Sequence, residues 1–472
     1  MHFPKRIYGI ENEFGVVVER ANGGFGWIEN AHVQSRLLPG KNAVLAKNPG
    51  MLRIWHSNGS CTYVDRGEHP EHATAECRSI RDVVCHNKAG EMLTAAIFNR
   101  RRYVDDTRLL LFKNNKGCNT LGQAEAEGEF GCHENYSVHS FNVGVEKDAR
   151  KLIPFLITRQ IIDGAGWLYR DGSCAYSQRA LSTQSEIGRG TGNDRGIIHV
   201  KDTGDTGPRL HVIVGDANIL EFAIYLKIGM TSIVLSLLES GYDPDMECIN
   251  SVRAIQQLSL NGDAHCPFLH MSSGEYLGAL EVQERYLEAA RRELSAATFA
   301  SEAVEAEIKH IIVLWEQTLN AIYARDTAWM LGRIDHATKR HIVERALARN
   351  KNADSDELWR IRKDIDIFYH NISDRTLQRR INKLWGDRRI VTDEEIRNAT
   401  FTPPCDTRAR MRGAFVAMLN RNGVDKVDYI DWIGCGNTNA YHNAVFNFRD
   451  PFAPDSIGFE SFLAEFEKKQ RE

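Results

Sequence analysis

The chain of 472 residues carries 59 Lys and Arg residues against 63 Asp and Glu residues, with 42% hydrophobic and 26% charged residues. This balance is typical of a globular protein, and it excludes disordered, collagen-like and fibrous chains. At roughly 100–200 residues per domain, the length allows several domains or one large core with an appended unit. A formal net charge of -4 offers no basic surface, so we expect neither nucleic acid nor an anionic membrane as a partner.

The ten cysteines include no CxxC pair and are scattered through the sequence. Because the sequence also starts without an apolar leader, we expect reduced thiols and a cytoplasmic location. The most apolar long stretch, residues 224–238, contains Lys227 and is shorter than the roughly 18 apolar residues that span a membrane. We therefore predict a cytoplasmic protein with no membrane partner.

The first predicted element is a strand over residues 7–18, where apolar and polar residues alternate. Because side chains two apart share a strand face, Glu11 and Glu13 lie on one side of this strand. Two carboxylates on one face need solvent, a cation or a metal as a partner. Residues 19–50 are rich in Gly and Asn and lack periodicity, so we expect a surface excursion there.

Two more strands are predicted before the first helix. Residues 62–65 place Tyr63 and Asp65 on a shared face, and residues 73–77 form a further segment able to pair. The apolar residues of the stretch 78–103 recur at helical spacing, which predicts a helix with one buried side.

The middle of the chain changes from strands to helices. A short strand is expected at 109–112, a helix at about 154–162, and a strand at 210–214. From residue 219 to about residue 348 the apolar spacing is mainly helical, and we expect this part to be scaffold.

The sequence predicts a separate small unit at the C-terminal end. Residues 402–404 read Thr-Pro-Pro and interrupt the helical pattern, and a new helix opens near Thr407, before a stretch with its own set of aromatic residues. We therefore predict a large catalytic domain at 1–398 and a small domain at 399–472 that packs on it.

Acidic residues recur on the predicted strands, namely Glu11, Glu13, Asp65, Glu71, Glu76 and Glu134. Mg²⁺ prefers oxygen ligands and commonly shares its coordination shell with substrate phosphates, so the pattern suits a site for ATP and a metal ion. The alternative is a set of unrelated carboxylates on solvated strand faces, which composition leaves open.

The sequence lacks the standard motifs that would indicate a nucleotide-binding loop or a zinc site. It has no GxxxxGK[ST] loop, and the Gly-rich residues 188–192 lack the flanking strand and helix of a dinucleotide loop, so we interpret them as a turn. The motif HExxH is absent, and the spacing of His69, His72, Glu76 and Cys77 matches no standard set of zinc ligands.

Eight motifs follow one another along nearly the whole chain: GIENEFG (9–15), YVDRGEHPEHATAEC (63–77), LFKNN (111–115), GCHENY (131–136), PFLITRQ (154–160), YSQRA (176–180), RLHVIVGDAN (209–218) and TRARMRG (407–413). Together they resemble the Pup ligase and depupylase family, which is similar in fold to glutamine synthetase and other carboxylate-amine ligases. The resemblance implies an α+β fold, with a large twisted antiparallel β-sheet that forms a cradle, helices behind it, and a small C-terminal α/β domain.

The resemblance also implies roles for residues at matching motif positions. It implies Mg²⁺ ligands at Glu11, Tyr63 and Glu71, ATP contacts at Thr74 and Trp432, and a catalytic base at Asp65. Further polar motif positions, expected near metal or phosphate, are Glu13 as a metal ligand, Arg209 as an ATP contact, His133 and Asn135.

Two positions depart from the family pattern. Cys61 stands where the family usually has an Arg that touches ATP, and the loop at 197–208 is shorter than the corresponding family loop. We therefore expect other cations, Lys201 or Arg209, to contact the phosphates.

The implied activity is that of an ATP-dependent Pup ligase, which joins the C-terminal glutamate of the prokaryotic ubiquitin-like protein Pup to a lysine of a substrate protein and so marks that protein for proteasomal degradation. The expected cofactors are ATP and Mg²⁺, and the expected partners are Pup and lysine-bearing proteins.

The alternative is a depupylase on the same scaffold, which hydrolyses the isopeptide bond. The segment between GIENEFG and YVDRG is short, and residues 132–136 read CHENY. Both features favour the ligase over the depupylase. A third interpretation, a non-catalytic Pup-binding scaffold, is disfavoured because all the expected metal ligands are retained.

Overall fold

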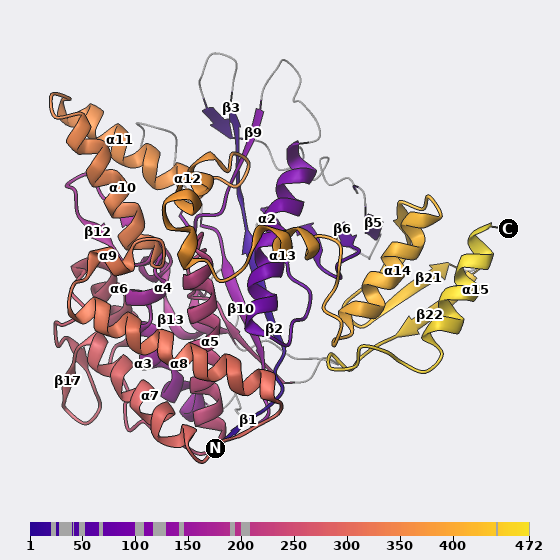
Figure 1. Cartoon of the computed structure of the whole chain (residues 1–472), viewed down its shortest axis with the longest axis horizontal. Coiled ribbons are helices and arrows are strands. Elements are labelled where there is room, and N and C mark those ends of the chain that lie inside the picture. Colours follow the sequence, from indigo (N-terminus) through magenta and orange to yellow (C-terminus); the bar gives the residue numbers. More distant parts are fainter. Residues whose placement is uncertain are drawn as a thin grey trace.

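The structure of the chain, a computed structural model, describes residues 1–19, 25–27, 40, 42–46, 52–65, 69–99, 108–116, 129–140, 146–188, 194–199, 208–439 and 442–471. Figure 1 shows a large body of sheet and helices that contains the N-terminus, with a smaller C-terminal part beside it.

In the described part of the chain, the main sheet has ten strands. Their order across the sheet is β13 (Ser185–Gly188), β14 (Gly196–His199), β15 (Arg209–Val212), β10 (Cys132–Ser137), β2 (Tyr8–Glu13), β8 (Pro70–Ala73), β7 (Cys61–Val64), β6 (Arg53–His56), β5 (Ala43–Ala46) and β19 (Lys426–Val427). Within this sheet the inner neighbours pair antiparallel, and the two edge pairs, β13 with β14 and β5 with β19, are parallel. The predicted α+β fold with a large, mainly antiparallel sheet is confirmed.

Shorter pairings accompany this sheet. A second sheet contains β4 (Phe25–Trp27), β3 (Gly15–Glu19) and β9 (Arg108–Phe112), and two-stranded pairs join β1 (His2–Phe3) to β18 (Thr298–Phe299), β11 (Trp167–Leu168) to β12 (Cys174–Ala175), and β16 (Leu269–His270) to β17 (Tyr276–Leu277). The strand predicted at 7–18 is therefore two strands in different sheets. The chain changes sheet at Phe14, because Phe14 is buried in a different apolar cluster from Ile10.

Helices cover the sheet and account for most of the second half of the chain. They are α2 (Ile80–Asn99), α3 (Glu146–Thr158), α4 (Gln160–Asp163), α5 (Glu221–Glu239), α6 (Ser251–Asn261), α7 (Ala279–Leu294), α8 (Glu302–Tyr323), α9 (Thr327–Met330), α10 (Asp335–Arg349), α11 (Ser355–Phe368), α12 (Thr376–Trp385) and α13 (Asp393–Asn398), with 3-10 turns at Ala180–Ser182 and Gly386–Arg388. Helix α2 packs against β2 and β8, and α5 packs against α2, α3, α7 and α8.

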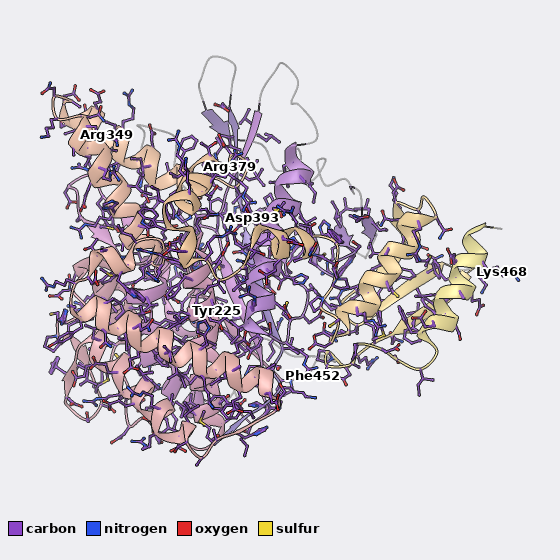
Figure 2. The ribbon with its side chains drawn as sticks, viewed as in Figure 1. Tyr225, Arg349, Arg379, Asp393, Phe452 and Lys468 are labelled. Atoms are coloured by element: carbon purple, nitrogen blue, oxygen red, sulfur yellow. The ribbon has the colours of Figure 1, made fainter. Side chains whose placement is uncertain are left out.

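Helix α5 forms the centre of the main body. Its length and apolar composition would suffice to cross a membrane, but 94% of its apolar window is buried inside the protein. Figure 2 shows Tyr225 of this helix among packed side chains, whereas Arg349 and Lys468 lie at the outer ends of α10 and of the C-terminal helix. The composition of α5 is therefore explained by its place in the core.

The C-terminal part contains α14 (Ala409–Arg421), α15 (Phe459–Arg471) and a sheet of β20 (Tyr429–Ile430), β21 (Gly434–Asn439) and β22 (His442–Asn447). Its apolar core is shared with the main sheet, because Phe415 and Phe466 belong to the same buried cluster as Trp55 and Val44. Strand β19 also joins the edge of the main sheet beside β5. The domain boundary after residue 398 stays a prediction, and the C-terminal part is docked through a common core.

Several predicted elements differ in position. The pairing predicted at 73–77 is confirmed in part, because the regular strand β8 covers Pro70–Ala73 and Cys77 forms an isolated antiparallel bridge with Tyr8. Between them, the hydroxyl of Thr74 accepts a hydrogen bond from the backbone N of Ile10 at 3.0 Å. The helix predicted to start at Pro154 starts at Glu146, with Pro154 inside α3. The expected excursion at 19–50 lies largely outside the described residues, but β4 and the buried β5 fall within it.

A buried ion pair anchors the centre of the sheet to the helices behind it. Glu134 of β10 pairs with both terminal nitrogens of Arg159, which also donates to Thr231 of α5 at 2.7 Å. The side chains of Arg159 and Glu134 are at most 1% exposed. Neighbouring residues of a strand point to opposite faces of the sheet. The ion pair therefore attaches β10 to the helices on one face, while His133 and Asn135 point to the other face.

Replacing Arg159 with Ala leaves the carboxylate of Glu134 buried without its bidentate partner. We expect the free energy of unfolding to fall by about 3–5 kcal/mol. Urea denaturation followed by tryptophan fluorescence measures this loss. The matched control is Arg340→Ala, because Arg340 pairs with Glu344 at 2.9 Å on the surface with 67% of its side chain exposed. That variant should lose under about 1 kcal/mol, and equal losses in the two variants would contradict the anchoring role.

Candidate active site

Strand β2 carries the two acidic residues that open the site. Glu11 lies opposite His133 on β10 and Ala73 on β8, and Glu13 lies opposite Glu71 on β8. Positions 9, 11 and 13 are the less buried positions of β2, so both carboxylates share one face as the alternation predicts.

Tyr63 and Glu71 face each other across β7 and β8, and the Tyr63 hydroxyl donates a hydrogen bond to the Glu71 carboxylate. Burial raises the pKa of Glu71 well above its usual range, and the carboxylates of Glu11 and Glu13 raise it further. Burial, together with Glu71 and Glu11, likewise raises the pKa of Tyr63. Like charges brought this close favour a bound cation, which would stabilise the ionised oxygens.

Asp65 lies beside this cluster, just after the end of β7. One of its carboxylate oxygens accepts a hydrogen bond from the backbone N of His69 at 2.8 Å. The ligand atoms of Asp65, Glu13 and His69 lie within 4.8 Å of one another. The residue predicted as the base is therefore adjacent to a residue predicted to hold metal.

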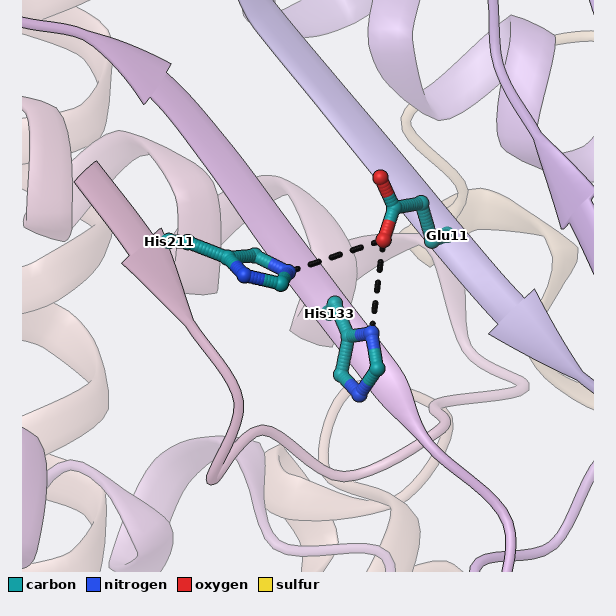
Figure 3. Close-up of side chains that lie close together, drawn as sticks. All are labelled: Glu11, His133 and His211. Carbon is teal, nitrogen blue, oxygen red and sulfur yellow. Dashed lines mark hydrogen bonds and ion pairs between the residues drawn. The ribbon is translucent and has the colours of Figure 1, made fainter. Parts of the chain in front are cut away.

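A second group of possible ligands lies on β2, β10 and β15 (Figure 3). One oxygen of Glu11 is 3.3 Å from Nδ1 of His133 and 3.5 Å from Nε2 of His211, and Asn135 donates to the other oxygen at 3.3 Å. His133 and Asn135 were expected near metal or phosphate, but His211 was missed. Its signal was the two-residue spacing from Arg209, which places both residues on one face of β15.

A pocket opens at one end of these strands and extends to the C-terminal part. Its wall includes the predicted residues Glu11, Thr74, Arg209 and Trp432, together with Tyr8, Glu76, Asn135 and Arg408. Trp432 comes from the turn between β20 and β21, whereas Thr74 follows β8. The four predicted residues thus meet from four separate segments of the chain.

The departure at Cys61 removes a cation from this region. Cys61 is buried on β7, and burial raises the pKa of its thiol to about 12. Arg209 and Arg408 supply cations in the pocket wall, and the buried Nε of Arg209 has no hydrogen-bond partner among the described residues. Lys201, the other expected cation, lies outside the described residues.

The residues considered for zinc are separated in the fold. His72 points to the opposite face of β8, where its Nδ1 is 2.9 Å from the hydroxyl of Thr62, and Glu76 pairs with Arg408 and Arg412. His69 instead lies beside Glu13 and Asp65. The structure gives no support to a zinc site built from these neighbours in the sequence.

Comparison with known proteins assigns the chain to a family. The chain belongs to the Pup-ligase family, because the family model described as Pup-ligase protein matches residues 6–434. The Pup-protein ligase of Corynebacterium diphtheriae is 32% identical over 465 residues, which cover 95% of this chain and 92% of that relative. The Pup-protein ligase of Actinosynnema mirum is 33% identical over 481 residues, which cover 98% of this chain and 99% of that relative.

Solved structures give the same assignment. A crystal structure of the complex between Pup and its ligase PafA matches with a TM-score of 0.82 and 26% identity, covering 98% of this chain and 92% of that one. A structure of the Pup ligase PafA in complex with ADP matches with a TM-score of 0.74 and 28% identity, covering 88% of this chain and 89% of that one. The family resemblance seen in the sequence motifs is confirmed.

The pairing of Glu76 with two arginines predicts how stability depends on pH. Burial raises the pKa of Glu76, but Arg412 and Arg408 outweigh it and lower the pKa from 4.5 to about 2. Because the folded-state pKa is the lower one, the stabilisation is fully present above about 4.5 and is lost as the pH falls toward 2.

In the variant Glu76→Gln we expect a loss of about 3 kcal/mol or more at pH 7, since the charged partner of two buried guanidinium groups is removed. Urea denaturation of both proteins between pH 7 and pH 3 measures the difference. The difference should shrink below pH 4.5, and a difference that does not change with pH would show that the charge of Glu76 is not its cause.

Proposed function

We propose that this chain is an ATP-dependent Pup ligase, which joins the side-chain carboxylate of the C-terminal glutamate of Pup to the amine of a substrate lysine. Relatives named as Pup-protein ligases match it over nearly the whole length of both chains. The strongest structural support is that Glu11 belongs both to the carboxylate cluster and to the wall of the pocket. A phosphate chain in this pocket can therefore reach the carboxylates while its base contacts the C-terminal part.

The chemistry requires activation of the glutamate. A carboxylate does not condense with an amine unaided, because the amine approaches an anion and oxide is not a viable leaving group. Transfer of the γ-phosphoryl group of ATP to the carboxylate gives a γ-glutamyl phosphate and ADP. The lysine amine then attacks the acyl carbon, and phosphate leaves as the isopeptide bond forms. Positioning and charge stabilisation are the main demands of the first step.

Mg²⁺ fits the donor set of the site. Glu11, Glu13, Glu71 and Tyr63 offer the oxygen atoms that this ion prefers, and the Oδ1 atom of Asn135 has no hydrogen-bond partner among the described residues. The raised pKa of Glu71 also indicates a site where a cation would relieve repulsion. A magnesium ion bound by these residues would neutralise charge on the phosphates and the carboxylate.

The remaining residues act on the nucleotide and the lysine. Trp432 provides an aromatic surface for the base, while Thr74 and Arg209 contact the ribose-phosphate part from the strands. Asp65 accepts the proton that the lysine ammonium must lose before its nitrogen can attack. Its position beside Glu13 and His69, at the edge of the carboxylate cluster, supports this role. The substrates are lysine-bearing proteins.

The cysteines of the described part are free, which agrees with the cytoplasmic location we propose.

Asp65→Asn keeps the shape of the side chain but removes the base. We expect ligation to slow by about 10²–10⁴-fold, since this is the usual contribution of a general base. The assay mixes the enzyme, MgATP, Pup ending in glutamate and an acceptor protein, and detects the isopeptide adduct by mass spectrometry. ADP affinity should be unchanged, and so should the activity of the control Asp387→Asn, whose side chain is 78% exposed.

Full ligation by Asp65→Asn would show that another group is the base. If the unmodified enzyme makes no adduct but releases Pup from a preformed conjugate, the chain is a depupylase. If it binds Pup but does neither reaction, it is a non-catalytic scaffold.

Glu71→Gln tests the metal site. Because an amide is a weaker ligand than a carboxylate, we expect the Mg²⁺ concentration for half-maximal ligation to rise by about tenfold or more, with part of the rate recovered at high Mg²⁺. Glu305→Gln is the matched control, since Glu305 is an exposed residue of α8 that pairs with Lys309. An unchanged Mg²⁺ dependence in Glu71→Gln would exclude Glu71 as a ligand.

A further inference from the structure

Arg412 of α14 connects three segments that are distant in the sequence. Its side chain is fully buried, and its nitrogens donate to the backbone oxygen of Gly59 at 2.9 Å, to the backbone oxygen of Trp432 at 3.1 Å, and to the carboxylate of Glu76. One arginine of the C-terminal part thus binds the loop before β7, the segment after β8 and the turn that carries Trp432.

The same guanidinium lies against two indole rings that also contact each other. Its central carbon is 4.7 Å from the ring centroid of Trp432 and 5.1 Å from that of Trp55. The two rings meet edge to face, with their centroids 4.8 Å apart. Because Arg412 is fully buried, its cation is attracted strongly to the aromatic rings, so Arg412 limits the position of the Trp432 ring.

Arg412 lies behind the proposed nucleotide pocket and not in its wall. The pocket is lined by Trp432 and Glu76, both of which contact Arg412 directly, whereas Arg412 and Trp55 are fully buried. Arg412 therefore sets the position of two wall residues without contacting the pocket itself. This contact therefore adds to the shared apolar core and to the pairing of β19 with β5 in holding Trp432 at the pocket.

We propose that Arg412 is a positioning residue that couples docking of the C-terminal part to nucleotide binding. This inference rests on the proposed nucleotide pocket. If the nucleotide contacts Trp432 in the position set by Arg412, then binding stabilises the docked arrangement. By thermodynamic linkage, the factor by which ADP favours the docked arrangement equals the factor by which docking strengthens ADP binding, so loss of the Arg412 contact weakens ADP binding.

The first test is direct ADP binding by calorimetry to the unmodified enzyme and to Arg412→Lys. Lysine keeps the positive charge facing Glu76 but loses the flat group that lies against the two rings and donates in three directions. We expect the dissociation constant of ADP to rise by about tenfold or more. In ligation assays the KM for ATP should rise while the KM for Pup stays unchanged, a split that general destabilisation would not produce.

Two further variants separate positioning from stability. Leu319→Ala removes buried apolar contact of α8, in a different apolar cluster from the one shared with the C-terminal part, so it should lower the melting temperature and leave ADP affinity unchanged. Trp55→Phe, which reduces the ring that contacts both Arg412 and Trp432, should weaken ADP binding in the same direction as Arg412→Lys but to a smaller extent.

Hydrogen exchange tests the reciprocal effect. ADP should slow amide exchange in residues 409–439 of the unmodified enzyme, and much less so in Arg412→Lys. The inference is wrong if Arg412→Lys binds ADP as tightly as the unmodified enzyme, or if Leu319→Ala weakens ADP binding equally. If the unmodified enzyme does not bind ADP at all, the proposed nucleotide site fails, and the inference fails with it.

Discussion

The arrangement of the site follows from one electrostatic constraint, the presence of several carboxylates on adjacent strands of one sheet face. Opposite residues of an antiparallel pair lie about 5 Å apart, and the backbone ladder prevents them from moving away from each other. Glu13 and Glu71 are such a pair, and Glu11 is close enough to raise the pKa of Glu71. Folding therefore brings negative charges together that a metal ion with bound phosphates can neutralise. Relief of the repulsion between these carboxylates then contributes to the free energy of metal binding.

The opposite face of the same strands holds this arrangement in place. On β10, His133 and Asn135 face the site and Glu134 faces Arg159 below. On β7 and β8, Tyr63 and Glu71 face the site, while Thr62 hydrogen-bonds His72 on the other side. Alternation thus gives each strand one row of side chains for chemistry and one row for attachment. Replacing a residue of the attachment row would therefore shift the residues on the reactive face, although the two rows do not contact each other.

The sequence predicted the features that depend on local spacing. Alternation correctly grouped Glu11 with Glu13, and four of the predicted site residues, Glu11, Thr74, Arg209 and Trp432, line one pocket, although their roles stay a prediction. The order of strands could not be deduced, because the contact between β2, β10 and β15 depends on pairing between residues far apart in the chain. For this reason His211 was missed, although it lies 3.5 Å from Glu11. The two residues of β19 carried too little pattern to predict their place at the sheet edge.

The long separation between partners in the site has a consequence for synthesis of the enzyme. Glu76 and Arg412 are 336 residues apart, and Trp432 follows still later. The strands with the acidic residues are made early, whereas the aromatic wall of the pocket is made near the end of translation. A nascent or prematurely terminated chain therefore lacks a complete nucleotide pocket. With ATP bound in this pocket as proposed, the ligase gains its activity only when its own chain is almost finished, and a truncated copy cannot attach Pup to other proteins.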